Sequence, residues 1–390
     1  MSRETEIAED IRQSMVAWRR DIHAHPETAF EEHRTANVVA QALQLMGLPV
    51  HRGLAGTGVV ATLKNGDGPA IALRADLDAL NMQELGANKP HVSQCAGKMH
   101  GCGHDGHTAM LLGAAAHLAR HKPFQGTVHF VFQPAEENEG GGRVMVDEGL
   151  FDLFPADAVY GMHNFPSLPR GQFAIRTGVM TAFLDTFEIT VTGQGCHGAM
   201  PETGIDPVVV SAQLVMALQT IVSRRTRATQ SAVVSVTQVH GGDTWNVIPE
   251  QMVLRGTVRT LDAAIQNQTE AAMRQICAGV GQTHGATVEL NYMRGYPGVV
   301  NTPAETQAAV AAAAALVGPA QVTTDMAPAM GSEDFAFMLQ KRPGAYIIIG
   351  AGEGPDNPPV HNPYYDFNDN ILPLGAAYWV ELTQQQLPLP

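Results

Sequence analysis

The sequence predicts an α/β domain that is interrupted by a smaller α+β domain. Three observations lead to this fold class. Short apolar segments, which indicate buried strands, alternate with helical segments towards both ends of the chain. Several of these strands are followed at once by residues of the types that bind metals. In the middle of the chain, apolar and polar residues alternate, which indicates half-buried strands.

The outer parts of the chain begin with an amphipathic helix, because apolar residues recur there at helical spacing from Ile7 to Ile22. Further helices are expected at 108–120 and at 302–317, with a shorter segment at 332–339. Buried strands are expected at 59–63, 70–73, 128–132, 158–160 and 346–349. Helices between buried strands are typical of an open, largely parallel sheet, which binds ligands beyond the carboxyl ends of its strands.

The inserted part follows the order β-α-β-β-α-β, which resembles a ferredoxin-like unit. Its second element, a helix over 207–225, has Asp206 as the expected N-cap and Pro207 in the first turn. The remaining elements are strands around 187–191, 232–239, 252–260 and 287–292 and a helix over 262–281. The predicted domain limits are 1–179 and 294–390 for the outer domain and 180–293 for the inserted one.

Composition narrows the class of protein. The chain has 390 residues, of which 45% are hydrophobic and 16% charged, and its formal net charge is -14. These values are typical of a compact globular enzyme and argue against binding to nucleic acid or to anionic membranes. Its four cysteines are sparse and irregularly spaced, so no disulfide framework is expected. With no signal peptide at the polar start and no apolar run of about 18 residues, we expect a cytoplasmic protein.

The most informative motif is M-H-G-C-G-H-D-G-H, at 99–107. It places Cys102, His104, Asp105 and His107 within a few residues, separated by glycines. Thiolate, imidazole and carboxylate groups bind borderline-soft divalent metals, and glycine lets neighbouring side chains aim at one point. Together with P-A-E-E, G-M-H and V-H-N-P later in the chain, the motif predicts a site for two metals.

Glu136 and Glu137 follow an expected strand directly. One carboxylate can bind metal while its neighbour accepts a proton from water. Because adjacent residues outside a helix point apart, we expect the two side chains to divide these tasks.

These motifs, in this order, resemble those of the metal-dependent N-acyl-amino-acid amidohydrolases. That family includes hippurate hydrolases, aminoacylase-like enzymes and auxin-conjugate hydrolases, within the wider carboxypeptidase G-like superfamily. The resemblance extends from R-R-D-I-H-A-H-P-E at 19–27 to H-N-P-Y-Y-D-F at 361–367. It implies a zinc-peptidase-like catalytic domain with a satellite domain, inserted at 180–293, that acts as a lid or dimerises.

By this resemblance, five positions match the metal ligands of the family: Cys102, His104, Glu137, His163 and His361. Glu136 matches the general base, which takes a proton from water and hands it to the leaving amine. His197 matches the residue that stabilises the oxyanion. The implied cofactors are two divalent ions, which could be zinc, manganese or cobalt. The implied substrate is a small N-acyl amino acid, and a homo-oligomer formed through the satellite domain is expected.

Other candidates have less support from the sequence. Asp76, Asp78 and Asp105 are expected to orient ligand imidazoles, although capping or turn formation would explain them equally well. Four residues could bind the substrate carboxylate: Asn246, Arg255, Gly331 and Ser332. Cys196 stands where the family often has a small residue, and Trp245 indicates either a preference for aromatic substrates or simple packing.

Two other activities on the same scaffold stay open at this stage: a dipeptidase and a diaminopimelate-type deacylase. A metal- or peptide-binding protein without catalysis is disfavoured, because the candidate base and all five candidate ligands are present. A zinc deaminase is excluded because the chain lacks the paired H-x-E and P-C-x-x-C pattern.

Overall fold

The computed structural model describes residues 7–86, 89–137, 139–354 and 356–390. It divides into two compact units: unit 1 contains Met1–Met180, Val299–Ala327 and Asp334–Pro390, and unit 2 contains Thr181–Gly298 and Pro328–Glu333. The predicted fold class is confirmed, since an α+β unit interrupts a larger α/β unit. The catalytic and lid roles assigned to these parts stay predictions.

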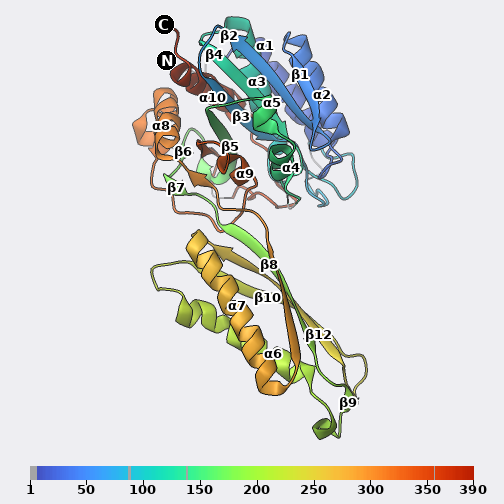
Figure 1. The fold of residues 1–390 in the computed structure, drawn as a ribbon. Helices are drawn as coiled ribbons and strands as arrows, with labels where there is room; N and C mark the ends of the chain where they lie inside the picture. The colour runs from blue at the N-terminus through green and yellow to red at the C-terminus, as the bar shows by residue number, and fades with distance from the viewer. Residues whose placement is uncertain (1–6, 87–88, 138, 355) are drawn as a thin grey trace. The chain divides into compact units, whose positions relative to one another are not determined.

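Unit 1 is built on an eight-stranded sheet of order β1-β2-β4-β3-β5-β16-β6-β15 (Figure 1). Its strands are β1 (Val50–Leu54), β2 (Gly58–Asn65), β3 (Ala70–Asp76), β4 (Gly126–Gln133), β5 (Ala158–Pro169), β6 (Phe173–Ala174), β15 (Val322–Thr323) and β16 (Gly344–Gly352). The central strands β4, β3, β5 and β16 are mutually parallel. A separate short pair joins β7 (Gly178–Val179) to β14 (Val300–Asn301).

Helices cover both faces of this sheet, which explains why most residues of its central strands are apolar. One face carries α1 (Glu9–Ala24), α2 (His33–Leu45), α3 (His104–His121), α8 (Pro303–Val317) and α10 (Leu372–Gln386), and the other carries α4 (Gly141–Asp147), α5 (Leu150–Leu153) and α9 (Phe335–Leu339). Successive residues of one strand enter opposite cores: Leu73 packs in the first and Ala72 in the second. Two short 3-10 turns, η4 (Pro319–Gln321) and η5 (Asp369–Ile371), complete the unit.

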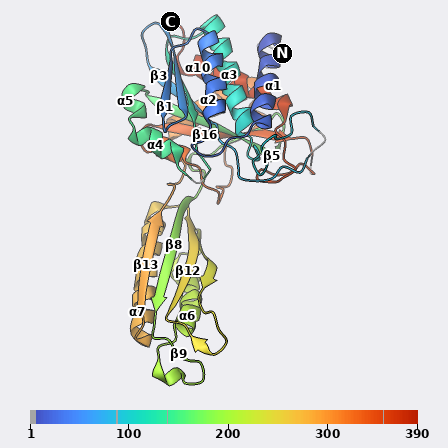
Figure 2. The ribbon, with the colours of Figure 1, turned by 90° about the vertical axis from the view of Figure 1, so that its right-hand side faces the viewer.

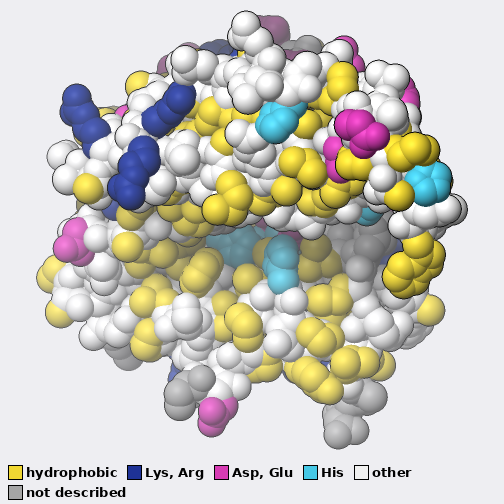
Figure 3. All heavy atoms as spheres, turned by 90° about the horizontal axis from the view of Figure 1, so that it is seen from below, with side chains coloured by type: hydrophobic (Ala, Val, Ile, Leu, Met, Phe, Trp, Pro, Cys, Tyr) yellow, Lys and Arg dark blue, Asp and Glu magenta, His cyan; other side chains and the backbone are white. Residues whose placement is uncertain are grey.

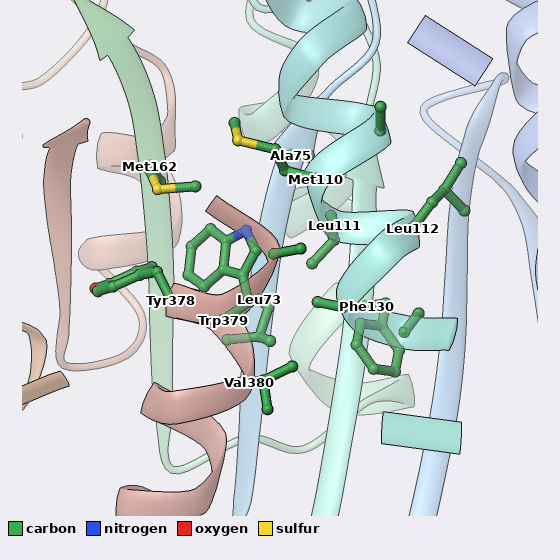
Figure 4. Close-up of a cluster of buried hydrophobic side chains, with 14 of the residues drawn as sticks. Leu73, Ala75, Met110, Leu111, Leu112, Phe130, Met162, Tyr378, Trp379 and Val380 are labelled. Carbon is green, nitrogen blue, oxygen red and sulfur yellow. The ribbon is translucent and has the colours of Figure 1, made fainter. Parts of the chain in front are cut away.

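The larger core lies between α3, α10 and the sheet (Figure 4). Trp379 of α10 and Phe130 of β4 are almost completely buried there. Burial of one such side chain stabilises the fold by roughly 2–3 kcal/mol. This packing provides a rigid base for the strand ends above it.

Two element limits differ from the sequence prediction, and both affect candidate ligands. Helix α3 begins at His104 rather than at 108, because Gly103 turns the chain at a φ of 98°. Strand β5 continues to Pro169, so His163 lies within it rather than after it. The longer strand is stabilised by parallel pairing with β16, in which His163 lies opposite Ile348.

Unit 2 contains a four-stranded antiparallel sheet of order β10-β12-β8-β13. Its elements are β8 (Phe183–Thr192), β9 (Cys196–His197), η2 (Pro201–Thr203), α6 (Pro207–Thr220), η3 (Ile221–Arg225), β10 (Ala232–His240), β11 (Val247–Ile248), β12 (Gln251–Thr260), α7 (Ala263–His284) and β13 (Thr287–Arg294). Helices α6 and α7 both lie on one face of the sheet (Figure 2). The carboxylates of Asp206 and Asp262 cap their first turns, as expected of such residues.

One helical segment, Pro207–Arg225, is long and apolar enough to cross a membrane by length and composition. The segment packs on the sheet of unit 2 through Val210, Leu214 and Leu218, and 33% of it is buried. In the view of Figure 3, the most prominent Lys and Arg side chains lie at the upper left, whereas Asp, Glu, His and hydrophobic side chains are scattered over the surface.

Candidate metal centre

The candidate ligands of unit 1 come from elements at one edge of its sheet. Cys102 and His104 lie where α3 begins, and Glu137 lies in the turn after β4. His163 lies in β5, and His361 lies in the loop after β16. Because β3, β4, β5 and β16 are parallel, their carboxyl ends meet at the same edge. Residues separated by up to 259 positions in sequence therefore become neighbours.

Cys102, His104 and His163 form a buried cluster, whose ligand atoms all lie within 4.8 Å of one another. Nδ1 of His104 lies 2.9 Å from the backbone oxygen of Asp78, and Nδ1 of His163 lies 2.7 Å from that of Asn164. These contacts direct both Nε2 atoms into the cluster. Nε2 of His163 lies 3.3 Å from Sγ of Cys102.

A second cluster shares Cys102 and adds Glu137 and His361, again within 4.8 Å. Nε2 of His361 lies 3.0 Å from a Glu137 carboxylate oxygen. The backbone of His361 has a φ of 62° and its N–H donates to the carbonyl of Gly101 at 2.7 Å. Tertiary contact thus holds this loop residue beside the α3 segment.

Glu136 and Glu137 converge instead of pointing apart, because they lie in a turn and not in an extended segment. Both carboxylates and His104 offer atoms within 4.8 Å of one another. The division of tasks between the two glutamates therefore does not come from divergent directions. All five candidate ligands and Glu136 belong to overlapping clusters.

Only glycine fits at position 103. A Cβ atom there would lie 2.2 Å from the side-chain oxygen of Asn164, and its φ of 98° disfavours any side chain. Glycine thus allows Cys102 and His104 to approach β5.

The three aspartates expected to orient imidazoles contact different partners. Asp78 contacts His104, with Oδ1 lying 3.0 Å from Nδ1. Asp76 contacts His107 at 2.7 Å, and Asp105 contacts His23 at 2.8 Å, so the closest imidazole of each belongs to a residue outside the candidate ligand set.

A buried polar network that the motifs did not predict lies beneath the site. The Arg74 guanidinium donates to Asp76, Gln133 and Asp334 at 2.8, 2.8 and 3.1 Å. The available signal was an arginine inside the apolar strand A-I-A-L-R-A-D. His107 of the 99–107 motif, for which the sequence predicts no specific role, also belongs to this region, because its Nε2 lies 2.7 Å from the Asn164 side-chain oxygen.

The pKa values of the candidate ligands indicate that the site favours a bound cation. Burial and the Glu137 carboxylate raise the pKa of the Cys102 thiol. Hydrogen bonds with Cys102 and Glu137 raise the pKa of His361 to about 10. Burial opposes the charged form of His104, yet Asp76 and Cys102 raise the pKa of its ring well above the usual value. The Asp76 and Glu137 carboxylates therefore favour positive charge in the site, and a divalent ion would supply it.

A buried nitrogen without a hydrogen-bond partner also indicates that the site fits a metal ion. Among the described residues, Nε2 of His104 is buried and has no hydrogen-bond partner. Buried polar atoms rarely stay unsatisfied, and this one faces a thiol and an imidazole. The set of sulfur, nitrogen and oxygen donors suits zinc and similar ions.

The other candidates lie in unit 2. His197 is exposed in β9, and Asn246 is exposed beside it, with its carbonyl accepting from the N–H of Gly198 at 2.7 Å. Arg255 in β12 forms an ion pair with Glu188 at 2.6 Å. Gly331 is exposed and Ser332 is half-buried. Their roles stay predictions.

Cys196 directly precedes His197, and Trp245 directly precedes Asn246; both pairs belong to unit 2. Cys196 is half-buried in β9, opposite Ile248 of β11. Trp245 is fully exposed, so it does not pack at the edge of its own unit.

Comparison with known proteins agrees with this geometry. The model of the peptidase family M20/M25/M40 matches residues 72–385. An N-acetylcysteine deacetylase of Bacillus subtilis is 37% identical over 94% of this chain and 95% of its own, and a hippurate hydrolase of Campylobacter jejuni is 38% identical over 95% of both. The crystal structure of the Bacillus subtilis YxeP protein, described as a dinuclear metal-binding peptidase of family M20, is 34% identical with a TM-score of 0.85, covering 97% of this chain and 99% of that one. The chain therefore belongs to peptidase family M20/M25/M40 and is a metal-dependent hydrolase.

Proposed function

We propose that this enzyme cleaves the amide bond of N-acyl amino acids, such as hippurate, to a carboxylic acid and a free amino acid. The observation that carries the proposal is the convergence of Cys102, His104, Glu137, His163 and His361 beside the Glu136 carboxylate. The named activities of the relatives support the same class of bond.

The five ligands would hold two divalent ions, for which zinc, manganese and cobalt are candidates. Such ions polarise a carbonyl and make water more acidic. Glu136 is 7% exposed and reaches the same cluster as His104 and Glu137, so its carboxylate can accept a proton from water held there. After water attacks the carbonyl carbon and the C–N bond breaks, Glu136 returns that proton to the leaving nitrogen. Both products then carry their correct hydrogens.

We further propose roles in substrate binding for residues of unit 2. We assign oxyanion stabilisation to His197, whose Nδ1 accepts from the N–H of Ala199 at 3.0 Å, which leaves Nε2 to donate. Asn246, Gly331 and Ser332 are candidates to bind the substrate carboxylate. Arg255 is the weakest of the four, because it would first have to leave Glu188. Exposed Trp245 is a candidate to contact an aromatic acyl group.

Unit 2 also offers a surface for a homo-oligomer. Helix α6 exposes Val209 by 55% and Met216 by 71%, and the edge strand β10 exposes Val239 by 50%. Exposed apolar side chains next to an edge strand are typical of a surface that pairs with a second copy. The four cysteines are free thiols, which supports a reducing compartment such as the cytoplasm.

The test is hydrolysis of hippurate, N-acetylcysteine, other N-acetyl amino acids, N-succinyl-diaminopimelate and dipeptides by enzyme stripped of metal and refilled with zinc, manganese or cobalt. We expect cleavage of acyl amino acids, and Glu136→Gln should lose about 100-fold or more of kcat while it still binds metal. Preference for dipeptides would favour a dipeptidase, and preference for succinyl-diaminopimelate would favour that deacylase. Turnover by Glu136→Gln near the parental rate would refute the assigned base.

A further inference from the structure

A buried carboxylate outside the ligand set contacts the turn that carries the catalytic glutamates. Glu32, directly before α2, is 0% exposed, and its Oε1 accepts the backbone N–H of Ala135 at 2.9 Å. Its Oε2 accepts the hydroxyl of Thr57 at 2.6 Å. Glu32 lies 103 positions before Ala135 in sequence, so only the fold brings it to this turn.

Ala135 has an unfavourable backbone conformation. Its φ is 53°, in the left-handed region that residues other than glycine and asparagine rarely adopt. Ala135 is completely buried, and its carbonyl accepts the N–H of Gly141 at 2.8 Å. Both backbone polar groups of Ala135 are therefore hydrogen-bonded, the N–H to Glu32 and the carbonyl to Gly141. Such strain persists only where the surroundings hold it.

The same Glu32 oxygen holds a second residue of this kind. It accepts the N–H of Phe30 at 3.1 Å, and Phe30 has a φ of 60°. Together Phe30 and Ala135 are two of five residues other than glycine with positive φ in the described part of the chain. One carboxylate oxygen thus anchors two strained segments to each other.

The conformation of Ala135 sets the direction in which Glu136 leaves the strand end. On the other side of Glu136, the N–H of Glu137 donates to Asp78 at 2.9 Å. Two buried carboxylates therefore bracket the candidate base, one before it and one after it. If Ala135 relaxed to a right-handed conformation, the peptide unit before Glu136 would rotate and its side chain would leave its place beside His104.

We propose that Glu32 is a positioning residue, which holds Ala135 in its left-handed conformation and so keeps the Glu136 carboxylate aimed at the reacting atoms. The inference rests on the proposed function, because it takes Glu136 as the base. Burial raises the pKa of Glu32 to about 7, whereas its bond from Thr57 works in the opposite direction. Burying an acid is unfavourable, and a side chain that only filled this space would not need to be acidic.

The experiment compares Glu32→Ala, Glu32→Gln and the double variant Glu32→Ala/Ala135→Gly with the parent. We expect Glu32→Ala to lower kcat by about 10-fold or more, with KM within about 2-fold and the same metal content. Glu32→Gln keeps an acceptor oxygen for Ala135 and should stay within about 3-fold of the parental kcat. Because glycine adopts positive φ without strain, adding Ala135→Gly to Glu32→Ala should recover about 3-fold or more. Thr57→Val is the matched control, since it removes only the contact at Oε2.

A second readout does not depend on turnover. Hydrogen exchange of the Ala135 amide should become faster by about 10-fold or more in Glu32→Ala and stay slow in Glu32→Gln and Thr57→Val. The inference is overturned if Glu32→Ala keeps parental kcat, if it loses metal instead, or if Ala135→Gly recovers nothing. Should Glu32→Ala not fold, a Glu32→Gln enzyme that loses kcat while its Ala135 amide stays protected overturns it equally.

The two proposals fail in different ways. If the parent cleaves no amide, the proposed function fails, and the exchange data still report whether Glu32 holds Ala135. If the parent is active and Glu136→Gln is not, but Glu32→Ala matches the parent, only the positioning role fails.

Discussion

Asp78 contacts two of the proposed metal ligands, His104 and Glu137, so a substitution of Asp78 tests how the site is held together. It is 1% exposed, and its Oδ1 lies 3.0 Å from Nδ1 of His104. Its Oδ2 accepts the N–H of Glu137 at 2.9 Å. One carboxylate thus connects the start of α3 to the turn after β4.

In Asp78→Asn, the side chain has only one oxygen left to accept a hydrogen bond. Its NH2 group replaces the other oxygen, so one of the two former partners, His104 or Glu137, meets a second donor instead of an acceptor. The backbone oxygen of Asp78 still accepts from His104 at 2.9 Å, so the asparagine oxygen should turn to Glu137 and its NH2 group to His104. A lost hydrogen bond to a charged group costs roughly 1.5–3 kcal/mol. Expressed wholly in metal binding, this corresponds to a Kd weakened by about 10- to 100-fold. Asp78→Ala loses both contacts and should weaken Kd by about 100-fold or more.

The assay is zinc titration in competition with a chelator of known affinity, together with the thermal midpoint of the metal-free proteins. Asp67→Asn is the matched control, because that side chain is fully exposed. A Kd for Asp78→Asn within about 3-fold of both the parent and Asp67→Asn would refute the reasoning, since removal of such an orienting partner normally has a larger effect.

Three further predictions follow from the packing and charges. Gly103→Ala adds a methyl group 2.2 Å from a neighbouring amide oxygen at a φ of 98°, so zinc Kd should weaken by about 10-fold or more in the same competition, and an unchanged Kd would contradict that constraint. Burial lowers the pKa of His23, but hydrogen bonds to Asp105 and Glu84 outweigh it and raise the pKa from 6.5 to about 9, so its stabilisation is complete below pH 6.5 and is lost as pH rises through 9. The free energy of unfolding of the parent relative to His23→Gln, measured in urea, should therefore fall by about 3 kcal/mol between pH 6 and 10, and a difference independent of pH would be inconsistent with this. Met216→Lys places a charge on the most exposed apolar side chain of α6, so if the proposed homo-oligomer forms through this surface, the variant should be a monomer in light scattering where the parent is not; a variant with the same mass as an oligomeric parent would exclude this surface.

Much of the fold followed from local pattern. Apolar runs located the buried strands, and alternation located the half-buried ones in unit 2. Asp206 before Pro207 marked the start of α6 correctly. The limits of α3 and β5 did not follow, because a left-handed Gly103 and pairing with β16 decided them.

The candidate ligands were also open to prediction, because their residue types and order are unusual and because strand ends gather at one edge of a parallel sheet. The partners of Asp76 and Asp105, the convergence of Glu136 with Glu137, and the anchoring of Ala135 by Glu32 were not. An acidic pair such as Glu31–Glu32 reads as an ordinary helix start, and nothing within its neighbourhood in sequence reveals Ala135.

Local chemistry was thus legible in the chain: which segments prefer helix or strand, which side chains can bind a cation, and which family motifs are present. Which buried acid meets which imidazole or peptide N–H depended on the folded molecule. The physical reason is that hydrophobic periodicity repeats over a few residues, whereas a buried hydrogen bond pairs groups up to hundreds of residues apart and is specified only once the strands and helices have packed.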